Sequence, residues 1–424
     1  MNFQSVKRKV RTGFVSTRLA GTDGVSLEVA KWVRVLTSSG HECFYFAAES
    51  EWPADHSLLV PEAHFKHPDI QALNADLFDD YTRSSQTSRQ VQTLKDHLKG
   101  HLERFVRTFG LDLLIAENAL SLPMNVPLGL ALTELIAETN IPTIGHHHDF
   151  TWERERYAVN AAADYLRAAF PPVLPSLHHV VINSFASREL ALRTGVSSRL
   201  IPNVMDFESP PPPPDAEAAD LRSALGLAPG EYFLLQPTRV VPRKRIERAI
   251  ELVRRLELPS ALVISHASSD EGDEYAVYLR EYADLLGVRL VFASGLIGDQ
   301  RSRAPEGRQQ FSLADGYQQA DVVTYPSAIE GFGNAFLETI YYRRPIVMSA
   351  YEIFKTDIEP KGFQVISFDT FVDDTTVART RTLLLDPASA GEMVRLNYEL
   401  GRHYYSLQAL DNRLAVLLHE SVGP

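Results

Sequence analysis

Short apolar runs alternate with amphipathic stretches along this chain, and this alternation constrains the fold more than any other feature of the sequence. The run RTGFVST comes first, and a glycine-containing loop, RLAGTDGVS, follows it. The next stretch, LEVAKWVRVLTSSGHE, has apolar residues at helical spacing and stops at Gly40, and CFYFAAE then has the pattern of a strand. Strand, loop, helix and strand in this order indicate a parallel α/β sheet.

The same alternation continues through both halves of the chain. In the first half it runs through LDLLIAEN (111–118), LGLALTELIAET (128–139), IPTIGHHH (141–148) and HHVVINS (178–184). The second half restarts it with EYFLLQPTR, RKRIERAIELVRRLE and SALVISH, and ends with ADVVTYPS, NAFLETIYYRR and PIVMSA. Continuous apolar runs suit strands that are covered on both faces. We therefore expect two doubly wound α/β domains of similar size.

Five successive prolines, Pro210 to Pro214, lie between these halves. Such a run excludes a helix or a central strand and predicts a stiff, extended segment. The predicted domains are residues 1–200 and 201–400, with residues 401–424 as a C-terminal helix that packs back on the first domain. Ligands of such sheets bind beyond the carboxyl ends of the strands, so two facing domains would line one cleft with their strand-end loops.

Composition narrows the classes of function. The net charge is −12 and the pI is about 5.6, which excludes a chain built to coat nucleic acid or anionic lipid. A single cysteine, Cys43, allows no internal disulfide and fits a reducing compartment. The apolar run after the basic N-terminus is only about five residues, too short for a signal peptide. No stretch approaches the roughly 18 apolar residues of a membrane span, so we expect a cytoplasmic protein.

The first predicted strand-to-helix loop, GTDGVS, contains Gly21 and Gly24. It matches neither the dinucleotide fingerprint Gly-x-Gly-x-x-Gly nor a P-loop, which argues against NAD and against ATP bound in the usual way. Two interpretations stay open. The loop leads into a helix N-terminus, where an anion or a sugar could bind, or its glycines only serve a tight turn.

The segment GHHHDFTWERERY places His146, His147, His148 and Asp149 at the end of a predicted strand. Imidazole and carboxylate are zinc ligands, but adjacent residues of a strand point to opposite faces, so the three histidines cannot all converge. We favour one or two of them as hydrogen-bond donors to a polar ligand. Arg154 and Arg156 could pair with a phosphate, or form a solvated face with neighbouring glutamates.

Two further segments follow strands of the second half. In PTRVVPRKR, Arg239 and Lys244 could neutralise a diphosphate near a helix N-terminus, although basic clusters are often solvated surface. In YPSAIEGFGNAFLE, two glutamates flank a Gly-Phe-Gly turn. We expect Asn334 to cap the helix, and a partly buried Glu338 that needs polar partners, such as ligand hydroxyls; the alternative is an ordinary surface glutamate.

Together these segments resemble one family, the retaining glycosyltransferases of family four, whose B-type fold has two facing Rossmann-like domains. RVVPRK is similar to the Arg…Lys donor-phosphate segment of that family. IPNVMD (201–206) resembles its Ile-Pro-Asn-Gly-Val-Asp segment, with Val204 in place of the glycine. YQQADVVTYPSAIEGFGNAFLE resembles its Glu-Gly-Phe-Gly block, which ends in a second glutamate. The resemblance covers nearly the whole chain.

The resemblance implies a role for each matching residue. Residues 1–200 would bind the acceptor and residues 201–400 the nucleotide sugar. Arg239 and Lys244 would hold the donor diphosphate, and Glu338 the ribose hydroxyls. The transferred sugar would meet Glu330 and His148, which complete a catalytic set with the two cations. The other donor-binding residues would be Gly24, Leu296, Gly331, Phe332, Gly333 and Asn334. For the acceptor we expect Arg18, Arg154 and Arg156.

The resemblance also implies retention of configuration and no metal, because cations of the protein would stabilise the leaving diphosphate. The partners would be a nucleotide sugar and a small acceptor, without nucleic acid and without integral membrane association. We favour glucose transfer from UDP-glucose to a sugar phosphate such as fructose 6-phosphate, as in sucrose-phosphate synthases. The alternatives are GDP-mannose- or UDP-glucose-dependent synthesis of a glycosylglycerate-type solute, a sugar-nucleotide epimerase, and a sugar-nucleotide sensor. The first loop lacks a Gly-Gly pair and Arg344 replaces a glycine, which leaves the acceptor geometry open.

Overall fold

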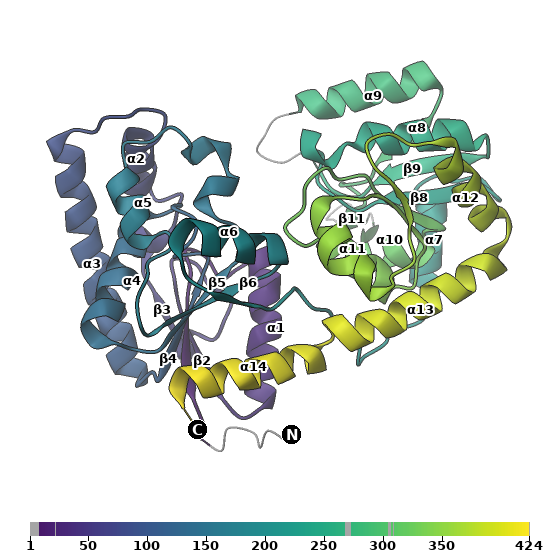
Figure 1. Cartoon of the computed structure of the whole chain (residues 1–424). Coiled ribbons are helices and arrows are strands. Elements are labelled where there is room, and N and C mark those ends of the chain that lie inside the picture. Colours follow the sequence, from purple (N-terminus) through teal and green to yellow (C-terminus); the bar gives the residue numbers. More distant parts are fainter. Residues whose placement is uncertain (1–7, 22, 268–272, 304–306, 308, 424) are drawn as a thin grey trace. The chain divides into compact units, whose positions relative to one another are not determined.

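The computed structural model describes residues 8–21, 23–267, 273–303, 307 and 309–423 of the chain. The segment in which we looked for a signal peptide begins with residues 1–7, which lie outside these ranges. The chain forms two compact units, the first made of residues 1–203 and 407–424 and the second of residues 204–406 (Figure 1). No helix in the described part of the chain is long and apolar enough to cross a membrane.

The first unit contains a parallel sheet with the strand order β3-β2-β1-β4-β5-β6-β7. Its strands are β1 (Arg11–Val15), β2 (Glu42–Ala47), β3 (Ser57–Leu59), β4 (Leu113–Glu117), β5 (Thr143–His147), β6 (Leu177–Val181) and β7 (Ser198–Leu200). The order runs outward in both directions from β1, so the sheet is doubly wound. All five residues of β4 and of β5 are buried, as continuous apolar runs predict for strands covered on both faces.

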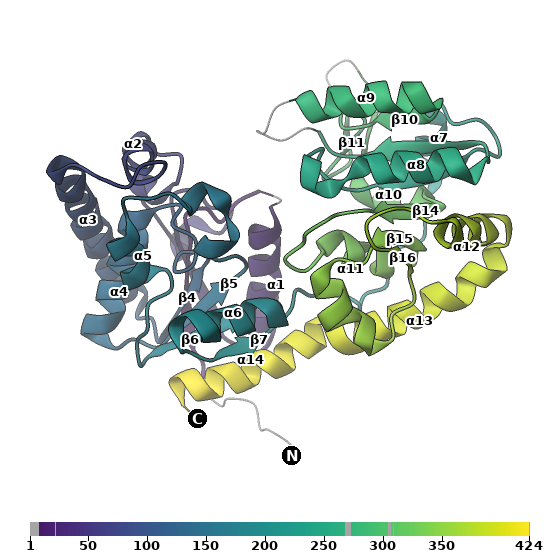
Figure 2. The same cartoon turned by 45° about the horizontal axis from the view of Figure 1, so that its top comes forward.

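Helices cover this first sheet (Figure 2). The helices of this unit are α1 (Gly24–Ser38), α2 (Pro68–Leu77), α3 (Ser85–Phe109), α4 (Val126–Thr139), α5 (Ala163–Ala169), α6 (Ser184–Thr194) and α14 (Leu407–Val422). The last helix of the chain, α14, lies against α1. There Ser39 donates a 2.8 Å hydrogen bond to Asp411, and Arg199 forms an ion pair with Glu420. These contacts attach the C-terminal segment to the first unit.

The second unit repeats the plan with a parallel sheet ordered β10-β9-β8-β14-β15-β16. Its strands are β8 (Tyr232–Gln236), β9 (Ser260–Ile264), β10 (Arg289–Phe292), β14 (Val322–Tyr325), β15 (Ile346–Ser349) and β16 (Ile366–Phe368). A small sheet adds β11 (Ile297–Gly298), β12 (Ser302–Arg303) and β13 (Gln309–Ser312). The helices are α7 (Ala216–Ala224), α8 (Ile246–Leu256), α9 (Glu274–Leu286), α10 (Leu313–Gln319), α11 (Asn334–Tyr341), α12 (Asp374–Leu385) and α13 (Pro387–Tyr405). The prediction of two doubly wound α/β domains is confirmed.

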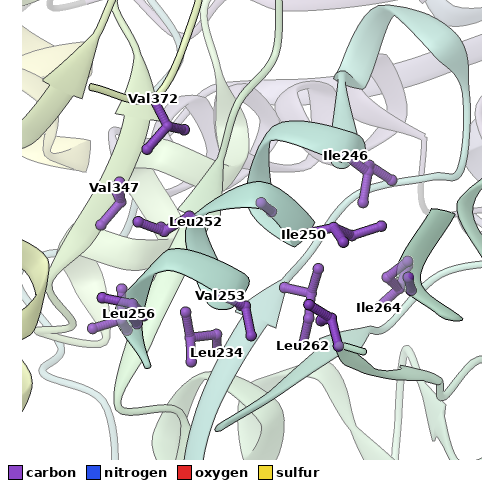
Figure 3. Packing of buried hydrophobic residues seen from close by; sticks show 14 of the residues in the cluster. Leu234, Ile246, Ile250, Leu252, Val253, Leu256, Leu262, Ile264, Val347 and Val372 are labelled. Carbon is purple, nitrogen blue, oxygen red and sulfur yellow. The ribbon is translucent and has the colours of Figure 1, made fainter. Parts of the chain in front are cut away.

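A hydrophobic core packs α8 against the second sheet (Figure 3). The apolar stripe of this helix is buried and consists of Ile246, Ala249, Ile250 and Val253. It meets Leu234 of β8 and Leu262 of β9. Burying a side chain of this size contributes about 1.5–3 kcal/mol, so this face fixes the helix on the sheet. The loop between β8 and α8, which carries basic residues, is thereby held at the carboxyl end of β8.

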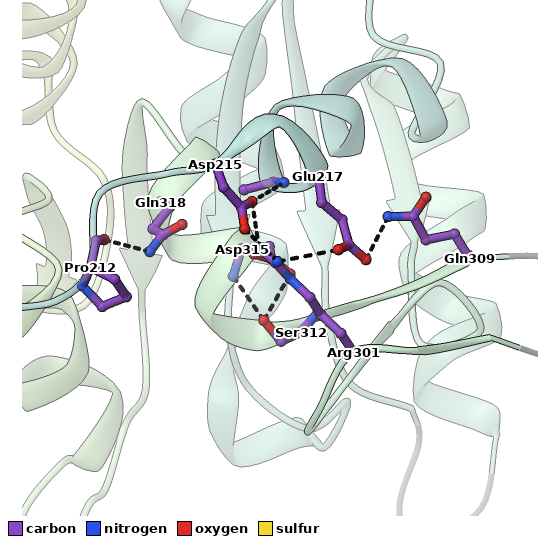
Figure 4. Close-up of polar contacts among 9 residues, drawn as sticks. Pro212, Asp215, Glu217, Arg301, Gln309, Ser312, Asp315 and Gln318 are labelled. Atoms are coloured by element: carbon purple, nitrogen blue, oxygen red, sulfur yellow. Dashed lines mark hydrogen bonds and ion pairs between the residues drawn. The ribbon is translucent and has the colours of Figure 1, made fainter.

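The proline run has no regular secondary structure and lies in the second unit. The Pro212 carbonyl accepts a 3.0 Å hydrogen bond from Gln318 of α10 (Figure 4). Just after the prolines, Asp215 receives two hydrogen bonds from Arg301, at 2.7 and 2.8 Å. The same guanidinium contacts Asp315, whose side chain is 2% exposed. Arg301 therefore ties the first turns of α7 and α10 together and holds the end of the proline run.

We expect Arg301→Met to lower the free energy of unfolding by about 1–3 kcal/mol, because it leaves the buried Asp315 carboxylate without its cation. Urea unfolding followed by circular dichroism measures the change. Arg303→Met, the same substitution at an exposed position two residues away, is the matched control and should fall within about 0.5 kcal/mol of the wild type. Equal unfolding curves for the two variants would contradict the assigned role of Arg301.

Candidate functional site in the strand-end loops

In the second unit, two loops follow β8 and β14, which are neighbours at the point where the strand order reverses. This is the position at which doubly wound sheets bind ligands. The loop after β8 carries Arg239 and Lys244, and the loop after β14 carries Glu330. The two loops are joined directly, because the backbone N–H of Ala328 donates a 2.9 Å hydrogen bond to the Arg243 carbonyl. The structure thus brings together three residues that the sequence analysis singled out.

Lys244 and Glu330 form a buried ion pair. Their side chains are only 10% and 11% exposed, and the Lys244 ammonium lies 5.5 Å from the centre of the Tyr325 ring. Burial lowers the pKa of Lys244, although the Glu330 carboxylate opposes this effect. Arg243 adds a second, longer contact to Glu330, at 3.9 Å. An ammonium in this setting interacts strongly with any further anion, because little water screens it.

Arg239 lies in the same loop, shortly after the end of β8, and its side chain is exposed. No ion pair involves it within the described ranges. His266, just after β9, lies in the same electrostatic neighbourhood: burial lowers its pKa, and Arg239 and Lys244 add to that effect. Its Nδ1 is 2.8 Å from the Ser265 hydroxyl. His266 was not selected from the sequence, although its place at the end of the apolar run SALVISH was a usable signal.

The Gly-Phe-Gly turn leads into α11, and its geometry corrects one prediction. The N-cap residue is Gly333, and Asn334 is the first residue of the helix, so the predicted cap at Asn334 is wrong. Gly333 has φ = 110°, and a Cβ there would lie 2.4 Å from the Tyr351 hydroxyl. That hydroxyl donates a 2.7 Å hydrogen bond to the Phe332 carbonyl. Only glycine fits this close, left-handed turn.

Glu338 and Leu296 complete the predicted donor residues. Glu338 is half-buried on α11 and accepts a 2.7 Å hydrogen bond from Tyr317, a fully buried residue that the sequence did not reveal. Burial, reinforced by the Glu338 charge, raises the pKa of Tyr317, which therefore stays a donor. Leu296 follows β10, and both its N–H and its C=O are bonded within the chain, to Ala293 and Phe311. Its partly buried side chain packs in the core.

In the first unit, the histidine run occupies the end of β5 beside β4. The alternation of a strand separates the three rings as predicted. His147 is buried on one face, where its Nε2 lies 2.9 Å from Nδ1 of His179. His146 and His148 lie on the other face, with ring centres 4.4 Å apart, and both contact Glu117, the last residue of β4. Glu117 was not selected from the sequence.

Glu117, His146 and His148 form a compact buried cluster. Nδ1 of His146 lies 2.9 Å from a Glu117 oxygen, and Nε2 of His148 lies 3.5 Å from the same oxygen. The Trp32 ring stacks on His146 with centres 4.2 Å apart. Within the described ranges, these three residues are also the one group whose potential metal-ligand atoms lie within 4.8 Å of one another. The 2.9 Å contact is a hydrogen-bond distance, and the carboxylate is already compensated by the imidazoles, so we interpret the cluster as a proton-bearing network.

The loop after β1 is arranged around Asp23, which caps α1. Its carboxylate accepts 3.1 Å hydrogen bonds from the N–H groups of Val25 and Ser26, and Gly24 is the first residue of the helix. Arg18 donates to the same carboxylate at 2.7 Å. The Asp23 carboxylate thus occupies the N-terminus of α1, where an anion of a ligand could otherwise bind. Arg18 is paired with the same carboxylate.

The remaining predicted acceptor residues follow β5. Arg154 forms a 2.8 Å ion pair with Asp149, while the exposed Arg156 lies over the Tyr157 ring at 4.7 Å. Of the three arginines expected to meet an acceptor, Arg18 and Arg154 are therefore held by aspartates, and Arg156 is the one most available to a ligand.

No protein-family model matches the chain. Solved structures share its fold over nearly its full length. Sucrose-phosphate synthase of Thermosynechococcus elongatus is 18% identical, with a TM-score of 0.65 over 97% of this chain and 99% of that one. HepE of Anabaena, in complex with UDP and glucose, is 12% identical, with a TM-score of 0.65 over 97% and 100%. At these identities the likeness concerns the fold alone, and the predicted B-type glycosyltransferase fold is confirmed.

Two curated proteins are similar in sequence along almost their whole length. The mannosylglucosylglycerate synthase of Petrotoga mobilis is 29% identical, over 93% of this chain and 98% of its own. That of Thermotoga maritima is 34% identical, over 93% of this chain and 96% of its own. The chain therefore belongs to the family of the mannosylglucosylglycerate synthases, and it is a glycosyltransferase of the hexosyltransferase class.

Proposed function

We propose that this chain transfers a hexose, with retention, from a nucleoside-diphosphate sugar to a glycosylglycerate-type acceptor. The observation that carries the proposal is the similarity to two mannosylglucosylglycerate synthases, 34% and 29% identical over 93% of this chain. Their name describes a product with a mannosyl, a glucosyl and a glycerate part, which suggests mannose as the transferred sugar and GDP-mannose as its donor. The sucrose-phosphate synthase activity favoured by the sequence rests only on a shared fold.

The donor diphosphate is assigned to the loops after β8 and β14. Lys244 is a buried ammonium in a region of low dielectric, and Arg239 offers an exposed guanidinium beside it. Such fixed charges stabilise the negative charge that develops on the leaving diphosphate, so we propose no metal at this step. Glu330 compensates Lys244 before the donor binds, and we assign it, with the turn at Gly331–Asn334, to the sugar hydroxyls.

Glu338 is assigned to the nucleoside end of the donor. A carboxylate accepts hydrogen bonds from two neighbouring hydroxyls, which suits a ribose. The Tyr317 hydroxyl, held at 2.7 Å, fixes the orientation of this carboxylate. Tyr317 is fully buried and its ring stacks on Tyr342 with centres 5.1 Å apart, so the orienting group is itself rigid.

For the sugar-transfer step we propose attack from the face that the diphosphate leaves, with the leaving phosphate oxygen taking the proton of the acceptor hydroxyl. His148 is assigned to the transferred sugar. The acceptor carries a carboxylate, in contrast to the phosphate that we expected from the sequence. Of the three arginines expected to meet an acceptor, Arg156 is exposed and forms no ion pair among the described residues, so we assign it to the acceptor carboxylate.

The test of the function is a screen of donors against acceptors that measures nucleoside diphosphate release and identifies the product by mass. We expect GDP-mannose with glucosylglycerate to give the highest kcat/KM, and UDP-glucose with fructose 6-phosphate to give little. Donor turnover or epimerisation without any acceptor would instead favour an epimerase. Tight binding of UDP or GDP without release in any pairing would favour a sensor, and either result would contradict the proposal.

Replacing Lys244 tests the donor site directly. We expect Lys244→Met to lower kcat by at least about 100-fold, because the leaving diphosphate loses a preorganised cation while the packing of the alkyl chain is kept. Lys355→Met, at a surface lysine of the same unit that pairs with Asp369, is the matched control and should keep wild-type kinetics. Unfolding midpoints of both variants show whether the fold is intact. Near-normal turnover of a folded Lys244→Met variant would refute the assignment.

A further inference from the structure

The end of β4 buries a carboxylate that the proposed function leaves unexplained. Glu117 is 1% exposed, and a buried carboxylate is tolerated only with compensating partners. Its partners are His146 and His148, from the neighbouring strand end. Neither Nε2 of His146 nor Nε2 of His148 has a hydrogen-bond partner within the described residues. Nε2 of His148 lies 3.5 Å from a Glu117 oxygen, which is within ion-pair distance for a protonated ring.

Several contacts fix the geometry of this pair. The Asn118 side chain accepts a 2.7 Å hydrogen bond from the backbone N–H of His148, and the Asn118 N–H donates a 3.0 Å bond to the His146 carbonyl. Asn118 thereby ties the residues just beyond β4 to the end of β5. On the far side, the Trp32 ring covers His146. The Glu117 carboxylate lies 2.9 Å from Nδ1 of His146, and this contact holds the carboxylate in place beside His148.

We propose that Glu117 is a positioning residue that holds the His148 imidazole in its charged form and in a fixed orientation at the end of β5. This inference rests on the proposed function, in which His148 contacts the transferred sugar. A charged imidazole donates from both ring nitrogens, whereas a neutral one has a single donor. Glu117 thus determines whether His148 reaches the sugar as a cationic donor. No covalent step is involved, because Glu117 only holds the proton on its neighbour.

The charges around His148 agree with this arrangement. Burial lowers the pKa of His148, but the adjacent Glu117 carboxylate and other nearby carboxylates together outweigh burial, and the pKa lies above its ordinary value. Glu28 of α1 and the neighbouring Asp149 act in the same direction. Glu28 forms a 2.9 Å ion pair with Lys31, and this positive charge reduces the effect of Glu28 on the pKa of His148. His147 contributes no positive charge near neutral pH, because burial holds its pKa well below the ordinary value.

The first arm of the test measures the ion pair without any substrate. Histidine titrations by ¹H–¹⁵N NMR on the full, ligand-free chain should show His148 protonated above pH 6.5 in the wild type. In Glu117→Gln the carboxylate is lost and the burial remains, so we expect the midpoint to fall by about one to three pH units. Glu134→Gln is the matched control, because Glu134 pairs with Lys95 and Lys99 in the same unit. An unmoved His148 midpoint in Glu117→Gln would overturn the inference.

The second arm measures the pH dependence of kcat for the transfer. A group with a raised pKa keeps its proton up to that pKa, so wild-type kcat should decline as pH rises through it. In Glu117→Gln the decline should move to lower pH by the same interval as the NMR midpoint, and the KM for the donor should change less than threefold. A loss of kcat that is equal at every pH would mark a structural role and overturn the inference. Glu117→Asp, which keeps the charge, should retain the wild-type profile even if its turnover is lower.

Three further outcomes separate the competing explanations. Two imidazoles and a carboxylate are also ligands for a divalent cation, so the purified wild type and Glu117→Gln should be compared by elemental analysis. A stoichiometric metal that is present in the wild type and lost in the variant would overturn the ion-pair account. A displaced NMR midpoint in a chain that transfers no hexose in any pairing would refute the proposed function and with it the catalytic role. An unmoved pH profile in an active transferase refutes the inference alone.

Discussion

The pairing of buried charges at the carboxyl ends of parallel strands underlies the candidate functional residues of each unit. A lone ammonium or carboxylate inside a protein is unstable, and each one here is held by a partner from a neighbouring loop. Lys244 follows β8 and Glu330 follows β14, and these strands are adjacent only because the sheet order reverses between them. The ion pair therefore depends on the topology, and the topology depends on apolar strands and on helices such as α8 that cover them.

The same physical rule acts a second time in the first unit. There β4 and β5 are neighbours in the sheet, and their last residues place Glu117 against His146 and His148. Both units thus keep a polar, charged group ready at a strand end without exposing it fully to water. In a setting of low dielectric such groups interact strongly with a charged or polarised substrate, and they need little rearrangement when it binds. This property suits the proposed transfer, in which the leaving phosphate oxygen takes the proton of the acceptor hydroxyl.

The strands, the helix faces and the loops of the site could be predicted from local sequence patterns. The stripe of α8 and the segments around Lys244 and Glu330 are examples. Partners that lie far away in the sequence could not: Glu117 is one polar residue in an apolar run, and Tyr317 resembles a core aromatic until its contact with Glu338 is seen. The long helix α3 was not predicted, because its buried residues form a sparse stripe among polar ones. The N-cap of α11 was predicted at Asn334 but is Gly333. The Tyr351 hydroxyl lies so close to Gly333 that only glycine fits at this position.

We propose that Lys244, released from its ion pair with Glu330, binds the donor diphosphate. Crystal structures of the full chain with GDP and with UDP measure this most directly. We expect the Lys244 ammonium to leave the Glu330 carboxylate and to lie about 3 Å from a diphosphate oxygen, with the ribose hydroxyls on Glu338. A diphosphate bound elsewhere, with Lys244 and Glu330 still paired, would contradict it.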